Sequence, residues 1–139
     1  MSRIQINFPA QAIFSTEIPV RITDLNYGNH LGNDAMLSIL HEARIQFLKS
    51  FGYSEMDVEG VGIIMSDAGI QFKTEAFYGD ILKIDIGVGE YSRVGFDIFY
   101  NVSCEQRIVA LAKTGIVFYD YERKKIAAVP VKFAEKFTK

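Results

Sequence analysis

Cysteine and histidine are scarce in this chain of 139 residues, and their scarcity excludes several kinds of site. Cys104 is the only cysteine, so the chain cannot form an internal disulfide or a cysteine-cluster metal site. The two histidines, His30 and His41, lack the spacing of metal ligands. We therefore expect no metal or other cofactor, and we expect Cys104 to be a buried, inert thiol.

Excess charge and long hydrophobic runs are missing as well. The formal net charge is -2, and the one basic run, Arg123-Lys124-Lys125, is short. This run indicates an exposed turn or a contact with an anionic group such as a phosphate, not a nucleic-acid surface. No apolar run approaches the roughly 18 residues that span a bilayer, and the N-terminus lacks a signal-peptide pattern. We expect a soluble, cytoplasmic protein that binds neither nucleic acid nor membranes.

The remaining composition is typical of one compact domain. Hydrophobic residues make up 49% of the chain and charged residues 23%. There is no internal repeat, low-complexity tract or linker, and the glycines at 87 and 89 lie in a strand-like pattern that does not form a phosphate loop. We expect a single domain over residues 1–139.

The pattern after residue 32 predicts one long helix. Asn33 is a good N-cap, Asp34 suits the positive end of the helix dipole, and Gly52 is expected to end the helix. Apolar residues recur at helical spacing, and others widen this surface, so we expect the helix to be covered on more than one side. The stripe consists of Met36, Leu40, Ala43 and Phe47, and the additional apolar residues are Leu37, Ile39, Ile45, Leu48 and Phe51.

Most of the other segments alternate apolar and polar residues with a period of two, which predicts strands. They cover residues 13–23, 62–74, 80–91, 94–104 and 108–119. The connections at 92–93 and 105–107 are short enough for hairpin turns, so their strands are expected to be antiparallel neighbours. Residues 131–137, after Pro130, are predicted to form a short last helix.

Together these elements predict an α+β domain with a sheet of five or six antiparallel strands curled around one long central helix. A single sheet layer leaves its outer face and its edge uncovered. The fold therefore predicts a homodimer or a larger assembly such as a tetramer.

Polar residues crowd the loop between the first strand and the helix. A helix N-terminus presents unpaired N–H groups and a partial positive charge, which can hold an oxyanion when a carbonyl is attacked. A carboxylate about two turns into the helix could position water or transfer a proton. This arrangement suits acyl chemistry, and its candidate residues are Asp24, Asn26, His30, Asn33 and Glu42.

The same segment resembles a known family. Residues 21–33, with the sequence RITDLNYGNHLGN, and the following Glu42-Ala43-Arg44 are similar to the hotdog-fold thioesterase superfamily, in particular its 4-hydroxybenzoyl-CoA and acyl-ACP thioesterase branch. That branch has Asp-x-Asp, a Gly-His-Val-Asn-Asn-like stretch and a helix with Glu-Ala-Arg. Phe77-Tyr78-Gly79-Asp80 also resembles the start of the branch's third strand. The resemblance implies a hotdog fold over the whole chain and an acyl-CoA or acyl-ACP substrate.

The resemblance fails at Asn26, which stands where the branch has its catalytic aspartate. An amide cannot act as nucleophile or general base. In one interpretation Asn26 orients thioester or water and Glu42 supplies the base, although ungapped spacing in relatives of this type points to His41. In a second interpretation the Asp24 carboxylate itself acts as nucleophile or general base. In a third, the chain has lost the activity.

Each candidate also has a purely structural interpretation. Asp24 could bond loop amides, Asn33 could cap the helix, and His30 could brace the loop. His41 could lie on a surface or interface, and Glu42 could pair near Arg44.

The leading prediction is an acyl-CoA thioesterase. The Asn33 N–H polarises the carbonyl, Asn26 and His30 orient thioester or water, and Glu42 is the base, within one chain or across a dimer interface. One alternative is a hydroxyacyl-thioester dehydratase or isomerase that uses His30 and Glu42, although the His-Phe-Pro signature of the fatty-acid dehydratases is absent. The other is a non-catalytic acyl-thioester binding protein, which the amide at Asn26 favours.

Overall fold

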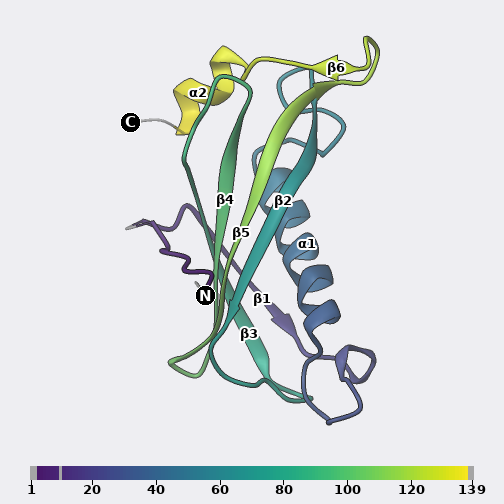
Figure 1. Ribbon diagram of the computed structural model, residues 1–139, viewed down its shortest axis with the longest axis vertical. Coiled ribbons are helices and arrows are strands. Elements are labelled where there is room, and N and C mark those ends of the chain that lie inside the picture. The colour runs from purple at the N-terminus through teal and green to yellow at the C-terminus, as the bar shows by residue number, and fades with distance from the viewer. Residues whose placement is uncertain (1–2, 10, 138–139) are drawn as a thin grey trace.

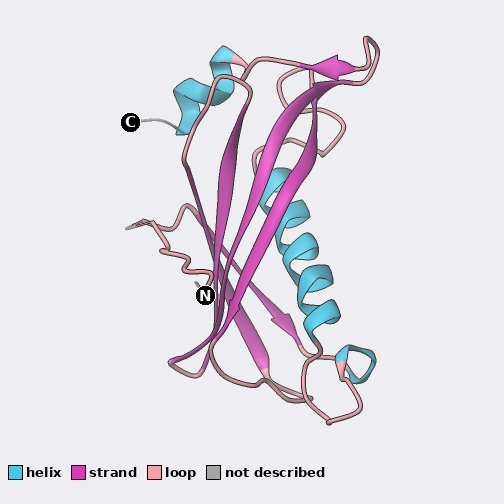
Figure 2. Ribbon diagram, viewed as in Figure 1, coloured by secondary structure: helices cyan, strands magenta, loops and turns pink. Residues whose placement is uncertain are grey.

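A computed structural model describes residues 3–9 and 11–137, and it shows one sheet with a long helix lying along it (Figures 1 and 2). The predicted α+β architecture is confirmed, including the short C-terminal helix. The helices are α1 (Asn33–Ser50) and α2 (Val131–Phe137), with a 3₁₀ turn η1 (Ile22–Asp24) before α1. The strands are β1 (Phe14–Pro19), β2 (Gly62–Phe72), β3 (Ile81–Gly89), β4 (Gly95–Cys104), β5 (Arg107–Asp120) and β6 (Lys125–Ile126).

The strands are ordered β1-β3-β4-β5-β2, every pair is antiparallel, and β6 pairs with the end of β5. The hairpin connections predicted between β3 and β4 and between β4 and β5 are confirmed. The sheet has β1 and β2 at its two edges. Pro19, which has no N–H to donate, ends the edge strand β1, where its missing donor costs little.

Helix α1 begins one residue earlier than the expected N-cap implies. Gly32, not Asn33, is the N-cap, and its carbonyl accepts the N–H of Met36 at 3.1 Å. Gly32 is fixed in an extended conformation because its own N–H donates to the Asp24 carbonyl at 3.0 Å. Within residues 3–9 and 11–137, no side chain caps this end of α1. The N–H groups of the first turn are therefore left without a side-chain acceptor.

The predicted end of α1 is confirmed. Gly52 has a φ of 79°, the left-handed conformation that glycine adopts without strain. The Tyr53 N–H donates to the Leu48 carbonyl at 2.8 Å, and the Gly52 N–H donates to the Lys49 carbonyl at 2.9 Å. This pair of bonds is the usual glycine-terminated helix end.

The core lies between α1 and the inner face of the sheet. The whole predicted stripe of α1 is buried, as are the alternating residues of β4 that face it. Leu37 and Ile45 are different, with exposed fractions of 45% and 37%. The sequence predicts that α1 is covered on more than one side, but the described residues of this chain cover only the side that faces the sheet.

The other face of the sheet is partly covered by the chain's own N-terminal segment. Residues 3–9 run along the side of the sheet opposite α1 (Figure 1). Ile6 is buried there, and its N–H donates to the Gln71 side-chain oxygen at 3.3 Å. Part of the outer face thus finds its cover within the same chain.

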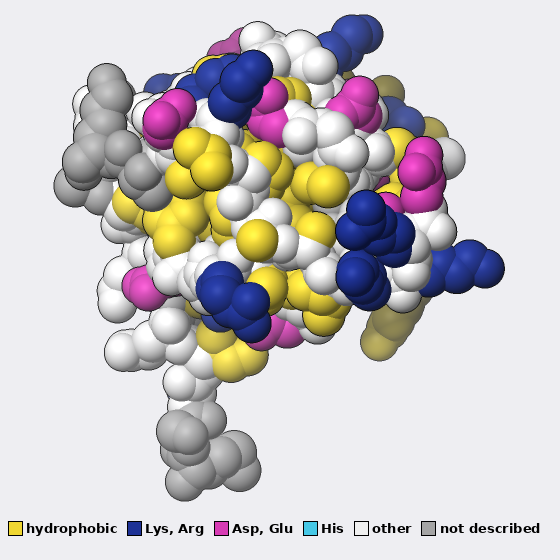
Figure 3. Space-filling model, turned by 90° about the horizontal axis from the view of Figure 1, so that it is seen from above, with side chains coloured by type: hydrophobic (Ala, Val, Ile, Leu, Met, Phe, Trp, Pro, Cys, Tyr) yellow, Lys and Arg dark blue, Asp and Glu magenta, His cyan; other side chains and the backbone are white. Residues whose placement is uncertain are grey.

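The end of the molecule that carries α2 is closed by aromatic packing. Phe133 is fully buried, with its ring centre 4.7 Å from that of Phe96 and 5.3 Å from that of Phe118. Seen from above, this end shows hydrophobic side chains gathered among Lys and Arg side chains (Figure 3). The run Arg123-Lys124-Lys125 lies here, exposed, in and after the turn that joins β5 to β6.

Two smaller predictions concern Cys104 and membranes. Cys104 is buried as expected, and burial raises the pKa of its thiol. Within residues 3–9 and 11–137, no helix combines the length and hydrophobicity that crossing a bilayer requires.

Candidate active site

The loop before α1 is held closed by Asp24 and Arg21. Asp24 is buried, and its carboxylate accepts the Arg21 backbone N–H at 2.8 Å and the Arg21 guanidinium at 3.2 and 3.3 Å. The Asp24 carbonyl accepts the N–H of Gly32, which joins the two ends of the loop. Both carboxylate oxygens are therefore used to shape the loop that leads into the helix.

Asn26 folds the tip of this loop. Its side-chain oxygen accepts the Gly28 N–H at 2.9 Å and the His30 N–H at 3.5 Å, and its backbone N–H donates to the His30 carbonyl at 2.9 Å. Asn29 takes up the left-handed conformation that this tight turn needs, with a φ of 67°. Because the amide oxygen of Asn26 is occupied, the NH₂ group is the part of this side chain that can donate to a ligand.

A second loop, after β2, meets the first beside His30. The Leu31 N–H donates to the Ala76 carbonyl at 2.8 Å, so the two backbones are joined directly. Next to this bond, the His30 Nε2 lies 3.1 Å from the Glu75 Oε2, and the Phe77 ring meets the imidazole edge-on at 6.3 Å. Sequence reasoning missed Glu75, because nothing in its local pattern shows that it will lie beside a histidine from another segment.

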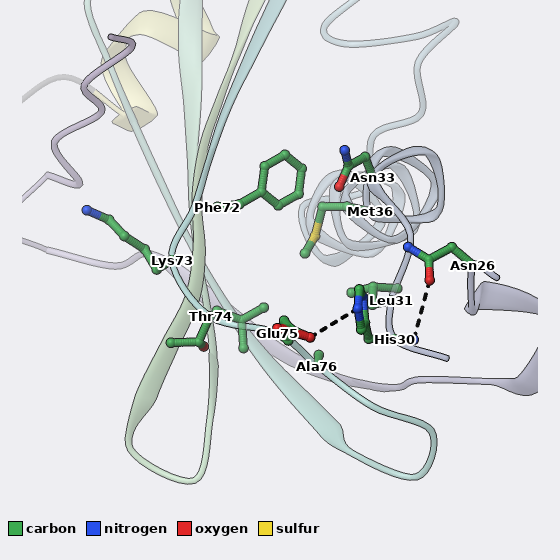
Figure 4. Close-up of a pocket in the computed structure, with 11 residues that line it drawn as sticks. Asn26, His30, Leu31, Asn33, Met36, Phe72, Lys73, Thr74, Glu75 and Ala76 are labelled. Atoms are coloured by element: carbon green, nitrogen blue, oxygen red, sulfur yellow. Dashed lines mark hydrogen bonds and ion pairs between the residues drawn. The ribbon is translucent and has the colours of Figure 1, made fainter. Parts of the chain in front are cut away.

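These two loops and the start of α1 enclose a cavity of about 290 Å³. Asn26, His30 and Asn33 reach it from one side, and Phe72 and Glu75 from the other (Figure 4). Its walls thus combine a few polar groups with apolar surface, which is usual for a small-molecule site. The other lining residues are Leu31, Met36, Lys73, Thr74, Ala76 and Val109.

The cavity lies at the N-terminus of α1. Asn33 is the first residue of the helix and is exposed, and the helix lacks a side-chain cap. Its N–H is one of the four that cannot bond within the helix, and it carries part of the positive end of the helix dipole. An oxygen atom that gains negative charge in this cavity would be stabilised there.

Family comparison agrees with this chemistry. The model of a family described as the thioesterase-like superfamily matches residues 20–137. The chain belongs to this superfamily. It shares 31% identity over 96 residues with an Aquifex aeolicus (strain VF5) protein provisionally named an esterase, covering 68% of this chain and 73% of that protein.

Two further relatives of this thioesterase-like chain have more specific names. A 1,4-dihydroxy-2-naphthoyl-CoA hydrolase of Microcystis aeruginosa (strain NIES-843 / IAM M-2473) is 35% identical over 82 residues, which are 57% of this chain and 59% of that protein. The crystal structure of a 1,4-dihydroxy-2-naphthoyl-CoA thioesterase from Synechocystis aligns with a TM-score of 0.79 and 22% identity, over 89% of this chain and 94% of that one. The hotdog fold expected from the sequence is confirmed.

The thioesterase-like site does not gather all the candidates into one cavity. Glu42 follows Asn33 by nine positions, which places it about 13–14 Å further along the helix and about half a turn around it. It accepts a hydrogen bond from Gln46 at 2.8 Å and lines a separate cavity of about 330 Å³ that Arg21 also lines. A catalytic role for Glu42 across a subunit interface stays a prediction.

Two other residues also lie apart from this cavity. His41 pairs with Glu55 at 3.2 Å, and Asp24 is occupied by Arg21. No group of three or more His, Cys, Asp or Glu in the described part of the chain is arranged to hold a metal ion.

The ionised Asp24 carboxylate makes the free energy of unfolding of this thioesterase-like chain depend on pH in the acid range. Burial raises the pKa of its carboxyl, but the hydrogen bonds from Arg21 outweigh this effect and hold the pKa below its ordinary value. The stabilisation is therefore complete above the unfolded-state pKa of about 3.9 and is lost as the pH falls through the folded-state pKa.

We expect Asp24→Asn to lower the free energy of unfolding at pH 7 by about 1–2 kcal/mol. The difference in free energy of unfolding between wild type and variant should disappear below about pH 4, because the wild-type carboxyl becomes protonated. Urea unfolding at several pH values measures this. A gap that stays constant down to pH 2 would show that the Asp24 charge is not responsible.

Proposed function

We propose that this chain hydrolyses an acyl-CoA thioester whose carbonyl oxygen binds at the N-terminus of α1. The observation that carries the proposal is the uncapped first turn of α1 at the edge of a cavity with polar and apolar walls. Membership of the thioesterase-like superfamily supports it.

Three residues have proposed roles in this reaction. The Asn33 N–H donates to the carbonyl oxygen and binds it more strongly as it becomes an oxyanion. The Asn26 NH₂ and the His30 imidazole orient the thioester and the attacking water. Asn26 is suited to this role because its oxygen is held by two backbone N–H groups, which fixes the direction of its free donor.

The lining of the cavity favours an aromatic acyl group. Phe72 projects across the cavity toward the start of α1, and the buried Met36 lies beneath Asn33 (Figure 4). An aromatic ring and a thioether both pack well against a flat aromatic group. Two relatives are named for an aromatic thioester, 1,4-dihydroxy-2-naphthoyl-CoA. We propose a hydroxylated aryl-CoA as the preferred class of substrate.

The test is the release of free CoA thiol from a panel of aryl-CoA and straight-chain acyl-CoA thioesters. The proposal predicts turnover well above spontaneous hydrolysis, with the highest kcat/KM for a hydroxyaryl-CoA. Tight binding of the thioesters with no thiol release would instead select the non-catalytic binding protein. Turnover restricted to straight chains would contradict the aromatic preference but not the hydrolase.

We also propose that two copies of the chain associate through the side of the molecule formed by β2 and α1. Strand β2 is an edge of the sheet, and its Ile64 and Met65 are 37% and 50% exposed. Met65 and the exposed Leu37 of α1 line the same shallow cavity, so apolar surface continues from strand to helix. Light scattering should give the mass of two chains or an even multiple, and the mass of one chain would contradict the proposal.

A further inference from the structure

One acidic residue lines the cavity at the start of α1, and it is not one of the residues that the family resemblance supplies. Among the lining residues that the structure describes, only Glu75 carries a carboxylate. Asn26, where the sequence resemblance implies a catalytic aspartate, has its oxygen bound to backbone N–H groups and cannot accept a proton from water. A carboxylate from another segment therefore lies in a site whose expected carboxylate is an amide.

The backbone on both sides of Glu75 is fixed by neighbouring strands and loops. Its own carbonyl accepts the Arg107 Nη2 at 3.2 Å, and the next residue, Ala76, accepts the N–H of Leu31. On the other side, the Thr74 hydroxyl donates to the Ile108 carbonyl at 2.9 Å. These bonds fix the backbone from which the Glu75 side chain, 61% exposed, reaches His30.

The ion-pair contact between Glu75 and His30 favours a proton on one of the two imidazole nitrogens. The Glu75 Oε2 lies 3.1 Å from the His30 Nε2, and a carboxylate stabilises a proton on the nitrogen that faces it. In the neutral ring the other nitrogen, Nδ1, then has a free lone pair. The Phe77 ring lies edge-on to the imidazole, with the ring centres 6.3 Å apart.

We propose that Glu75 is a positioning residue that holds His30 in this tautomer, so that the His30 Nδ1 is the general base of the reaction. This inference rests on the proposed thioester hydrolysis and assigns the proton acceptor that Asn26 cannot provide. An exposed ion pair contributes little to folding stability, so the pair has no evident structural purpose.

The proposed hydrolysis needs only the thioester and one water molecule as reactants. The water oxygen forms a bond to the thioester carbonyl carbon, and one water proton passes to the His30 Nδ1. The carbonyl electrons move to the oxygen held by the Asn33 N–H. When this intermediate collapses, the C–S bond breaks, the imidazolium returns its proton to the leaving sulfur, and the carboxylic acid formed loses its remaining proton to solvent.

The test combines kinetics with ¹⁵N NMR of the imidazole, using the aryl-CoA that the wild type turns over fastest. Glu75→Gln should lower kcat about 10-fold with KM nearly unchanged, and His30→Ala should lower it about 100-fold. The double variant should be no slower than His30→Ala, because Glu75 acts only through His30. NMR of the free wild type should show the proton on Nε2, and Glu75→Gln should give a mixture of tautomers.

The control is Glu122→Gln, which removes an exposed carboxylate in the β5–β6 turn at the other end of the molecule and should leave kcat unchanged. Wild-type kcat in Glu75→Gln, multiplication of the two losses in the double variant, or a wild-type proton on Nδ1 would each overturn the role of Glu75 alone. A wild type that hydrolyses no thioester would overturn the proposed function itself.

Discussion

Replacing Asn33 by proline should lower kcat for thioester hydrolysis by about 10²–10³-fold with little change in melting temperature. Asn33 is the first residue of α1, the helical position at which proline is most readily accepted. Gly32 before it has φ -76° and ψ 154°, the extended conformation that a residue preceding proline prefers. The substitution therefore removes the proposed oxyanion donor and leaves the helix in place.

The matched control for this variant is Asn33→Ala. Alanine keeps the backbone N–H and removes only the side chain, so the proposal expects kcat within a few-fold of wild type. Steady-state kinetics and thermal unfolding of both variants measure the two effects separately. Equal losses of kcat in the two variants would assign the effect to the side chain, and an active proline variant would exclude this N–H as the donor.

Replacing Arg44 by methionine should lower the free energy of unfolding by about 3 kcal/mol. The Arg44 side chain is 8% exposed, and it donates to Glu55 at 3.0 Å and to the buried Tyr100 hydroxyl at 3.3 Å. The Tyr100 hydroxyl in turn lies 2.8 Å from that of Thr114. Methionine fills similar space but leaves this buried chain of polar groups without its cation.

Denaturant unfolding measures this loss, with Arg123→Met as the control. The Arg123 side chain is 73% exposed and pairs only loosely with Asp120, at 3.8 Å, so its loss should cost less than about 0.5 kcal/mol. Tyr100→Phe should be intermediate, because it removes one bond of the chain and keeps the ring. A loss below about 1 kcal/mol for Arg44→Met would show that the buried chain contributes little to stability.

The fold could be predicted because its elements have strong local patterns. The helical spacing of the apolar residues correctly predicted that Met36, Leu40, Ala43 and Phe47 are buried. The period of two in the other segments correctly predicted the strands that cover them. The N-cap was misassigned because Asn33 has the better capping side chain. The structure uses Gly32 instead, since the Asp24 carbonyl fixes the Gly32 N–H through a contact between positions eight apart.

The candidate site could be predicted only where it is continuous in sequence. Asn26, His30 and Asn33 lie on one loop and the helix that follows it, so one continuous sequence motif contains all three. Glu75 could not be found this way, because it reaches His30 through the hydrogen bonds that dock the β2 end onto β5 and onto Leu31. Helical geometry turns Glu42 away from Asn33, so the spacing along the chain does not bring Glu42 into the cavity that Asn33 lines.

The proposed oxyanion site is tested directly by a crystal structure with a non-hydrolysable aryl-CoA analogue in which a ketone replaces the thioester. The ketone oxygen should lie about 2.7–3.1 Å from the backbone nitrogen of Asn33, with the aryl group against Phe72. A ketone bound elsewhere, with the Asn33 N–H covered by protein in the assembled molecule, would contradict it.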